Sequence, residues 1–313
     1  MIFRNTFRLL LTNFSNVWKV LVYYIICIAL TVGVCWSIAS PIIAELNKAN
    51  VFSDLGNLLN SFFSEPTIAP ITLREILTNA KDVFVSNAQF TPNYIIFIIW
   101  IFFVFPFTLD LAGLALGEVF YGYMTSQVKY TFTGRFIKNI GKGCLYSFFK
   151  YFAQILLNIA LFAIFYLMIK LYSLGSFLYV LLDIALLALL LCVVAFKYTI
   201  FSCFMPSMAV LDCNVFKALE KNFKIVYKNF FRIFSNCITL VLTALVVNLI
   251  FCVFTFSVSL IVTLPLTAVV FVIFQMVSYF SSCGMRFYVY PDMFISPKKF
   301  EEQDKVKKVK YII

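Results

Sequence analysis

The chain contains no histidine among its 313 residues. This absence excludes the histidine-bearing motifs of zinc proteases and any Ser–His nucleophile pair. There is also no GxxxxGKS/T phosphate loop, so the chain is not expected to be an ATPase by itself. The nine cysteines match no zinc spacing and are interpreted as small packing residues. We therefore expect a protein that is not an enzyme and that binds no metal and no cofactor.

Charged residues are scarce. They make up 12% of the chain, whereas hydrophobic residues make up 63%. A soluble domain of this length needs far more charge to cover its surface, and a run of about 20 apolar residues can cross a bilayer. Six apolar runs are long enough, at about 18–45, 94–124, 148–170, 176–201, 233–260 and 264–290. The sequence therefore predicts an all-α, polytopic membrane helix bundle with about six transmembrane helices.

Lysine and arginine are distributed unevenly between the segments that join these runs. With the N-terminus inside the cell, the outer side holds only Lys48, Arg74, Lys81 and Lys170. Because membrane proteins keep Lys and Arg mainly on the cytoplasmic side, both termini are predicted to be cytoplasmic in a plasma-membrane protein. The net charge of +11 follows from this asymmetry, so nucleic acid is not an expected partner.

A short basic stretch leads into apolar segments three times along the chain. Each stretch contains an apolar–aromatic–basic triplet: Val17-Trp18-Lys19, Phe148-Phe149-Lys150 and Phe230-Phe231-Arg232. Another cation lies fifteen residues before the last member of each triplet, at Arg4, Arg135 and Lys217. This recurrence predicts three repeats, each made of a helix in the membrane plane followed by two spans.

The basic stretches have the pattern of amphipathic helices. In the third stretch, one stripe at steps of three and four contains Phe216, Leu219, Phe223, Val226 and Phe230. Lysines form a second stripe roughly opposite, which suits a helix in the headgroup plane. The predicted lipid-headgroup-binding residues are Arg4, Arg8, Arg135, Lys138, Lys142, Lys217, Lys221, Lys224 and Lys228. Asp212 or Asn214 is available to cap the third helix. The alternative interpretation is that these stretches are only the cytoplasmic ends of long spans.

We expect a single integral membrane domain over residues 1–313. Its expected parts are an in-plane helix and first span (1–45), an outer helical loop (46–92), a second span (93–125), an in-plane helix with two spans (126–204), a further in-plane helix with two spans (205–290) and a cytoplasmic tail (291–313). The outer loop is too short for an independent catalytic domain.

The second span carries two ionisable side chains, Asp110 and Glu118. Charged groups within a span are costly and therefore mark candidate functional positions. The eight-residue spacing points both carboxylates roughly the same way. Gly113 and Gly117 form a GxxxG pair that permits close helix approach, and Pro106 is expected to kink or break the helix before Asp110.

Two interpretations of these carboxylates remain open. Either they line a polar cavity, or Glu118 lies at the headgroups and pairs with Lys129 or Arg135. Asp183 lies early in the fourth span and is expected to mark the outer interface. An intramembrane aspartyl protease is not expected, because Asp110 and Asp183 are predicted at different depths and lack a GxGD context.

The segment from Met208 to Phe234 has a distinctive order of residue types. The residues that define it are Asp212, Ala218, Leu219, Asn222, Phe223, Asn229, Phe230, Phe231 and Arg232. This stretch resembles the membrane domain that is fused to some bacterial glycerophosphodiester phosphodiesterases and that also occurs in stand-alone relatives. The six-span pattern extends the resemblance loosely to the whole chain. No hydrolase domain is expected here, so the resemblance implies a bacterial membrane protein without phosphodiesterase activity.

Two functional hypotheses follow. The first is a non-enzymatic scaffold or accessory protein of the bacterial plasma membrane that contacts anionic lipids through its basic helices. Membrane lipids are then the expected partners, and a protein partner or homo-oligomer stays open. The alternative is a permease in which Asp110 is the coupling carboxylate. Internal repeats and a Pro/Gly-containing broken span favour the permease, whereas the few polar residues in the other spans do not.

Overall fold

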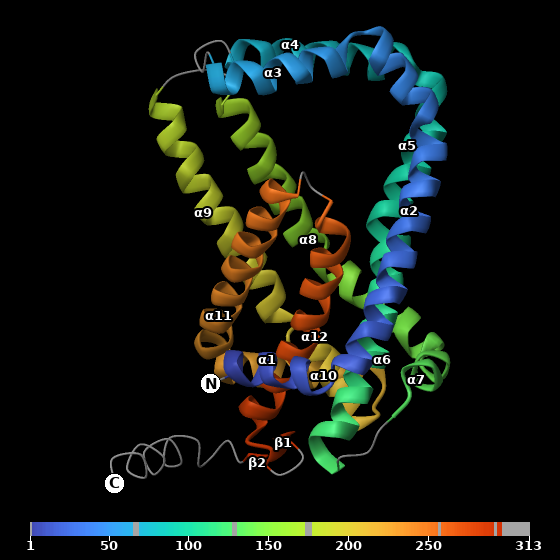
Figure 1. Cartoon of the computed structure of the whole chain (residues 1–313), viewed down its shortest axis with the longest axis vertical. Helices are drawn as coiled ribbons and strands as arrows, with labels where there is room; N and C mark the ends of the chain where they lie inside the picture. Colours follow the sequence, from blue (N-terminus) through green and yellow to red (C-terminus); the bar gives the residue numbers. More distant parts are fainter. Residues whose placement is uncertain are drawn as a thin grey trace. The chain divides into compact units, whose positions relative to one another are not determined.

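The computed structural model describes residues 2–64, 69–126, 130–172, 177–255, 258–290 and 293–295 (Figure 1). Its elements are α1 (Ile2–Thr12), α2 (Phe14–Lys48), α3 (Val51–Ser64), α4 (Ala69–Ser86), the 3-10 helix η1 (Ala88–Phe90), α5 (Thr91–Ile99), the π-helix η2 (Trp100–Val104), α6 (Phe105–Ser126), α7 (Phe132–Lys138), α8 (Ile140–Tyr172), α9 (Phe177–Ile200), α10 (Phe204–Leu211), α11 (Val215–Phe254), α12 (Leu260–Cys283), β1 (Phe287–Tyr290) and β2 (Met293–Ile295). The all-α prediction is confirmed, with one short strand pair added.

Five helices in the described part of the chain are long and apolar enough to cross a membrane. They are Val17–Lys48, Ile140–Leu171, Leu181–Leu211, Val215–Phe254 and Leu260–Cys283. Each overlaps one of the predicted spans, so the chain has the architecture of a multi-pass membrane protein. The remaining predicted span, 94–124, is divided among α5, η2 and α6. A sixth crossing therefore stays a prediction.

The helix is interrupted just before Asp110, as the sequence predicts. In the π-helix η2, the N–H of Phe105 bonds to the carbonyl of Trp100, five residues back. Pro106 follows this π-turn inside a helical run that is unbroken from Thr91 to Ser126, and the backbone of both Ile99 and Phe105 is helical. The interruption before Asp110 is therefore a local change from α- to π-type hydrogen bonding, and the chain stays helical through it.

The chain forms two compact units. The first unit combines the described parts of 1–27, 107–153 and 195–313, and the second combines those of 28–106 and 154–194. Helices α2, α8 and α9 each contribute residues to both units. The two units are described separately below.

Helix α6 is the core of the first unit. Every residue from 111 to 120 is buried. A side chain added at Gly117 would collide with the sulfur of Met205 on α10, and one added at Gly143 on α8 would lie 2.5 Å from Cδ1 of Leu111. Such contacts exclude any larger residue unless the neighbour moves. The close approach predicted at the GxxxG pair is therefore present at Gly117.

Each predicted basic stretch is separated from its span by a break at an asparagine. Asn13 separates α1 from α2, and Asn139, with φ −97° and ψ 5°, separates α7 from α8. Asn229 has non-helical φ −122° and ψ 21° inside α11. The side-chain amides of Asn13 and Asn229 donate to the carbonyls of Leu9 and Ile225, four residues earlier. The stretches are therefore not simply the ends of straight spans, although their orientation in a membrane stays a prediction.

The first and last described segments of the first unit pack together. Strands β1 and β2 pair antiparallel, and β1 contacts α1. Thr12 donates a hydrogen bond to the carbonyl of Val289 at 3.5 Å, and the Arg8 guanidinium lies over the Tyr290 ring. Helix α12 ends at Cys283 because Gly284 takes a left-handed conformation, with φ 64°. The predicted last span is therefore too long, and residues 293–295 of the predicted tail form β2.

The second unit includes the helices of the predicted outer loop. Helices α3 and α4 pack against each other, as Figure 1 shows. The rings of Phe84 and Tyr94 meet edge to face, with centroids 5.2 Å apart. Asn93 donates a hydrogen bond to the carbonyl of Ile38 on α2 at 3.1 Å. The prediction that residues 46–92 are largely helical is confirmed for their described part.

Candidate polar and basic sites

Asp110 lies in a polar cluster between α6 and α8 in the first unit. One carboxylate oxygen is 2.5 Å from Nζ of Lys150, and the other accepts a hydrogen bond from Ser147 at 3.0 Å. The two charged side chains are 13% and 20% exposed, respectively. Asp110 is thus a compensated anion that joins two helices.

Aromatic side chains surround this ion pair. The ammonium group of Lys150 lies 5.6 Å from the ring centroids of Tyr146 and Tyr151. Tyr24 on α2 donates to the carbonyl of Leu109 at 3.2 Å. Removing one member of a buried ion pair leaves the other charge uncompensated, which costs about 3–5 kcal/mol. The cluster therefore holds α8 against α6.

Sequence reasoning identified Asp110 but not its partner. Lys150 was interpreted as the basic member of the second triplet, facing the membrane boundary. The sequence does contain an indication of this pair, because Asp110 and Lys150 are charges of opposite sign in adjacent apolar runs. Lys197 on α9 belongs to the same region, since it lies within electrostatic range of both.

Glu118 pairs with Arg135 and does not line an open cavity. The carboxylate of Glu118 is buried, and its oxygen lies 3.2 Å from Nη1 of Arg135 on α7. The guanidinium of Arg135 also covers the Tyr130 ring at 3.8 Å from its centroid. The predicted pairing with Arg135 is confirmed, whereas the other predicted partner, Lys129, lies outside the described residues. This bond attaches α7 to the core helix.

Asp183 belongs to a different unit from the other two candidate carboxylates. It is half-buried on α9 in the second unit, whereas Asp110 and Glu118 belong to the first. Its Oδ1 atom is buried and has no hydrogen-bond partner among the described residues. The position of Asp183 at the outer interface stays a prediction.

The N-terminal half of α11 has a buried face that differs from the predicted apolar stripe. Ala218, Asn222 and Val226 are buried, whereas Phe216 and Phe223 of the predicted stripe are exposed. The four predicted lysines, Lys217, Lys221, Lys224 and Lys228, are all exposed. Val226 belongs both to this buried face and to the predicted stripe, whereas Phe216 and Phe223 lie on the surface. The stripe was expected to face lipid and not the protein core, so its role stays a prediction.

Asn222 connects α11 to the turn between α9 and α10. Its side-chain oxygen accepts a hydrogen bond from the N–H of Cys203 at 3.0 Å, and its amide donates to the carbonyl of Ile200 at 2.7 Å. Because helix ends leave backbone groups without partners, a buried amide that supplies both bonds stabilises this turn. The sequence marked Asn222 only through the resemblance and did not reveal this role.

The predicted caps of α11 are not found. Asn214 occupies the N-cap position but makes no side-chain capping bond, and Asp212 ends α10 with a positive φ of 42°. Asp212 instead forms an ion pair with Lys142 on α8. Hydrogen bonding to the Lys142 ammonium lowers the pKa of the Asp212 carboxyl below its usual range. Lys142 therefore links two of the basic segments.

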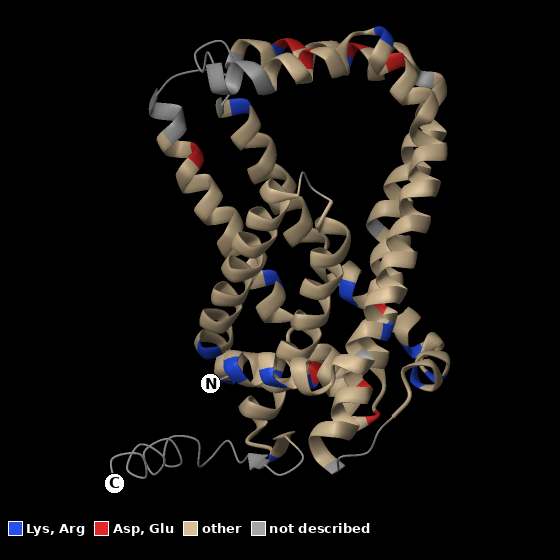
Figure 2. Cartoon of the chain, viewed as in Figure 1, with Lys and Arg blue, Asp and Glu red and all other residues tan. Residues whose placement is uncertain are grey.

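The cations are concentrated in one unit. Among the described lysines and arginines, only Lys48, Arg74, Lys81 and Lys170 belong to the second unit (Figure 2). They are the four that the sequence assigned to the outer side. All the predicted headgroup-binding residues lie in the first unit. Three of these, Arg135, Lys142 and Lys224, are neutralised by nearby carboxylates. Among the described residues, no group of three His, Cys, Asp or Glu side chains is placed to hold a metal.

No family model, no curated protein and no solved structure matches this chain.

Proposed function

We propose that the chain is a non-enzymatic, multi-pass protein of a bacterial plasma membrane that holds anionic lipids at its basic helices. In this function it acts as a scaffold or accessory protein for a membrane process. The observation that supports it is the surplus of exposed cations beside helix breaks in the first unit, above all Lys217, Lys221 and Lys228 on α11. Cations near a membrane surface attract anionic lipid by about 1 kcal/mol each.

The contact between α1 and β1 supports a membrane topology for this function. Helix α1 leads directly into the first span, and β1 follows the last span, α12. The contact between these two segments supports placing both ends of the bundle on one side of the membrane, which in turn implies an even number of crossings. An even number favours a sixth crossing by α5, η2 and α6. The proposed resemblance to the phosphodiesterase-associated membrane domain rests mainly on residues 208–234, and the six-span pattern extends it loosely to the rest of the chain.

A specific observation also favours the permease as a second candidate. Asp110 follows a π-helix, and π-helical turns occur frequently at functional sites. Broken spans at polar side chains are a feature of transporters. Against this candidate, the carboxylate is already paired with Lys150 and bonded to Ser147.

One pair of variants separates the two candidates. The full chain is reconstituted in vesicles of phosphatidylglycerol and phosphatidylcholine, with lysine-to-glutamate reversal at 217, 221, 224 and 228 or with Asp110→Asn. We expect reversal to abolish phosphatidylglycerol enrichment around the protein and Asp110→Asn to leave it unchanged. A pH jump that drives charge movement across the vesicle membrane, lost in Asp110→Asn, would instead support the permease.

A further inference from the structure

The break in α11 forms a hollow between its basic half and its apolar half. Asn229 leaves the helical conformation at this point, with φ −122° and ψ 21°. The hollow has a volume of about 550 Å³ and is lined by Tyr227, Lys228, Asn229, Phe230, Phe231 and Arg232. All six residues come from one continuous segment, so the geometry of the hollow depends on the break itself.

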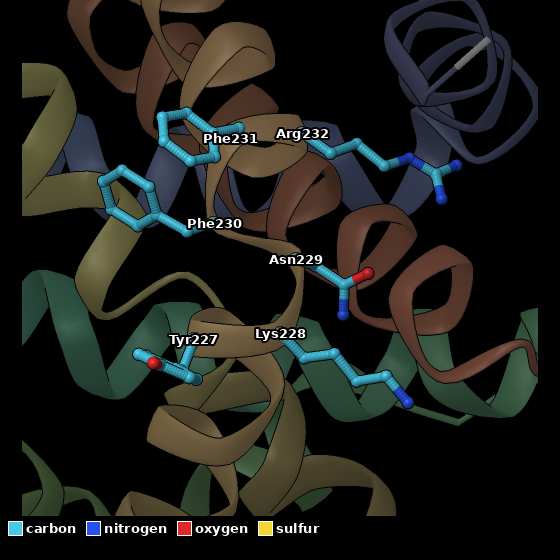
Figure 3. Close-up of a pocket in the computed structure, with 6 residues that line it drawn as sticks. All are labelled: Tyr227, Lys228, Asn229, Phe230, Phe231 and Arg232. Carbon is cyan, nitrogen blue, oxygen red and sulfur yellow. The ribbon is translucent and has the colours of Figure 1, made fainter.

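The lining side chains separate by chemical type. Figure 3 shows the nitrogen-bearing ends of Lys228, Asn229 and Arg232 on one side of α11 and the three aromatic rings on the other. Figure 3 places the side chain of Asn229 between those of Lys228 and Arg232. The Asn229 amide donates one N–H to the carbonyl of Ile225 at 3.1 Å, which leaves its second N–H for a ligand. The hollow therefore presents two cations and a neutral amide together.

Arg232 is held in position and retains donors. Its Nη2 atom donates to the hydroxyl of Ser281 on α12 at 2.8 Å. A guanidinium has five N–H donors, so this bond leaves most of them for a ligand. Between described residues, neither Arg232 nor Lys228 forms an ion pair with a carboxylate, in contrast to Arg135, Lys142 and Lys150. The charge at the break is thus uncompensated by acidic side chains.

The aromatic rings indicate the depth of the break relative to a bilayer. Tyr227 is 90% exposed and Phe231 is 85% exposed, which is unusual for rings that are not in contact with lipid or a partner. Aromatic side chains concentrate at the membrane–water boundary, where headgroup phosphates also lie. The apolar part of α11 begins directly beyond the break. This position favours a phospholipid over a soluble anion.

We propose that the α11 break is a specific site for the phosphate of an anionic phospholipid, bound by Lys228, Asn229 and Arg232 with the acyl chains along the apolar half of α11. This inference rests on the proposed lipid-binding function and deepens it, because it assigns one stoichiometric site in place of diffuse attraction. Guanidinium and ammonium groups form short charge-assisted hydrogen bonds with phosphate oxygens.

The test uses the full chain in nanodiscs of phosphatidylglycerol and phosphatidylcholine, followed by native mass spectrometry after detergent release. The test variant is Lys228→Gln with Arg232→Gln. Its matched control is Lys217→Gln with Lys221→Gln, which removes two cations from the same helix away from the break. We expect the test variant to retain one phosphatidylglycerol about tenfold less tightly than wild type, because two charge-assisted hydrogen bonds are lost. The control is expected to retain that lipid and to lose only weakly bound ones.

The outcomes distinguish this site from the broader function. Equal loss in the two double variants would overturn the specific site and leave the lipid-binding function standing. No loss in either would overturn both. Displacement of the retained lipid by millimolar inorganic phosphate would show a soluble-anion site and contradict the phospholipid assignment. If the test variant does not fold, Lys228→Gln is compared with Lys221→Gln, and equal retention would again overturn the site.

Discussion

The two units of this protein use charge in different ways. In the first unit, three ion pairs each join separate segments: Asp110 to Lys150, Glu118 to Arg135 and Asp212 to Lys142. In the described part of the second unit, the ion pair between Glu45 and Lys48 joins neighbours on one helix. The pairs of the first unit therefore hold separate segments together, whereas the described pair of the second unit lies within one helix.

This difference shows that the number of cations in a segment does not by itself identify which of them can bind lipid. The predicted lipid-binding cations occur in similar sequence contexts, but in the structure some are paired with carboxylates and others are not. Arg135 and Lys142 stabilise the fold through carboxylates, whereas Lys217, Lys221 and Lys228 are exposed without a carboxylate partner among the described residues. The second group is therefore the one on which the proposed lipid contact depends.

The largest effect is expected at the buried pair of Asp110 and Lys150. Asp110→Leu leaves Lys150 uncompensated and should lower the free energy of unfolding by about 3–5 kcal/mol. The double variant with Lys150→Leu should recover much of this loss. In the second unit, Asp183→Leu removes a half-buried carboxylate outside any observed ion pair and should cost far less. Denaturant titration in detergent measures the free energy of unfolding of each variant. Equal losses for Asp110→Leu and Asp183→Leu would contradict the claim that charge stabilises the first unit more than the second.

The next effect concerns Asn222. Asn222→Leu leaves the N–H of Cys203 and the carbonyl of Ile200 without partners, which should cost about 2–4 kcal/mol. Asn236→Leu on the same helix is the control, because the Asn236 amide donates only to the carbonyl of Arg232 within the helix. The melting temperatures of the two variants are compared by thermal unfolding. Similar melting temperatures would show that the α9–α10 turn does not depend on Asn222.

A smaller effect is expected at Glu118. Glu118→Gln removes the carboxylate that holds Arg135 and should cost about 1–3 kcal/mol. It should also loosen α7, so that proteolysis or hydrogen exchange there increases before the rest of the unit is affected. Glu220→Gln, in an exposed pair on one helix, is the control and should leave both measurements unchanged. Uniform loosening of the whole unit would argue against a local attachment.

The smallest effect is the acid dependence of the pair between Asp212 and Lys142. Because the folded-state pKa of Asp212 is lowered, this pair adds stability above the unfolded pKa of about 3.9. That stability is lost as the pH falls through the folded-state pKa. The contribution is small, since both side chains are largely exposed. The melting temperatures of wild type and Asp212→Asn should therefore converge on acidification, and a constant gap would contradict the pairing.

Much of the fold could be predicted from the sequence. Apolar runs predicted six spans, and five of them overlap long apolar helices in the described part of the chain, because length alone identifies a segment that can cross a bilayer. The basic stretches were recognised by their periodicity. The breaks at Asn13 and Asn139 were not predicted, because a single asparagine in a polar stretch does not by itself mark a helix end.

The candidate site was only partly predictable. Asp110 and Glu118 stand out because charges in an apolar run are costly. Their partners depend on which helices pack together, and this tertiary information is not contained in local patterns. The buried face of α11 was missed for a similar reason, since Ala218 and Asn222 are not typical core residues. The β1–β2 pair was missed because it is only a few residues long.

The most direct test compares equal losses of positive charge in the two units. One variant changes Lys217, Lys221, Lys224 and Lys228 to glutamine, and the other changes Lys48, Arg74, Lys81 and Lys170. Phosphatidylglycerol enrichment around each full-length protein is measured in mixed nanodiscs of phosphatidylglycerol and phosphatidylcholine. We predict that enrichment falls sharply in the first variant and stays near the wild-type value in the second. Equal enrichment in both variants would contradict lipid binding by the basic helix of the first unit.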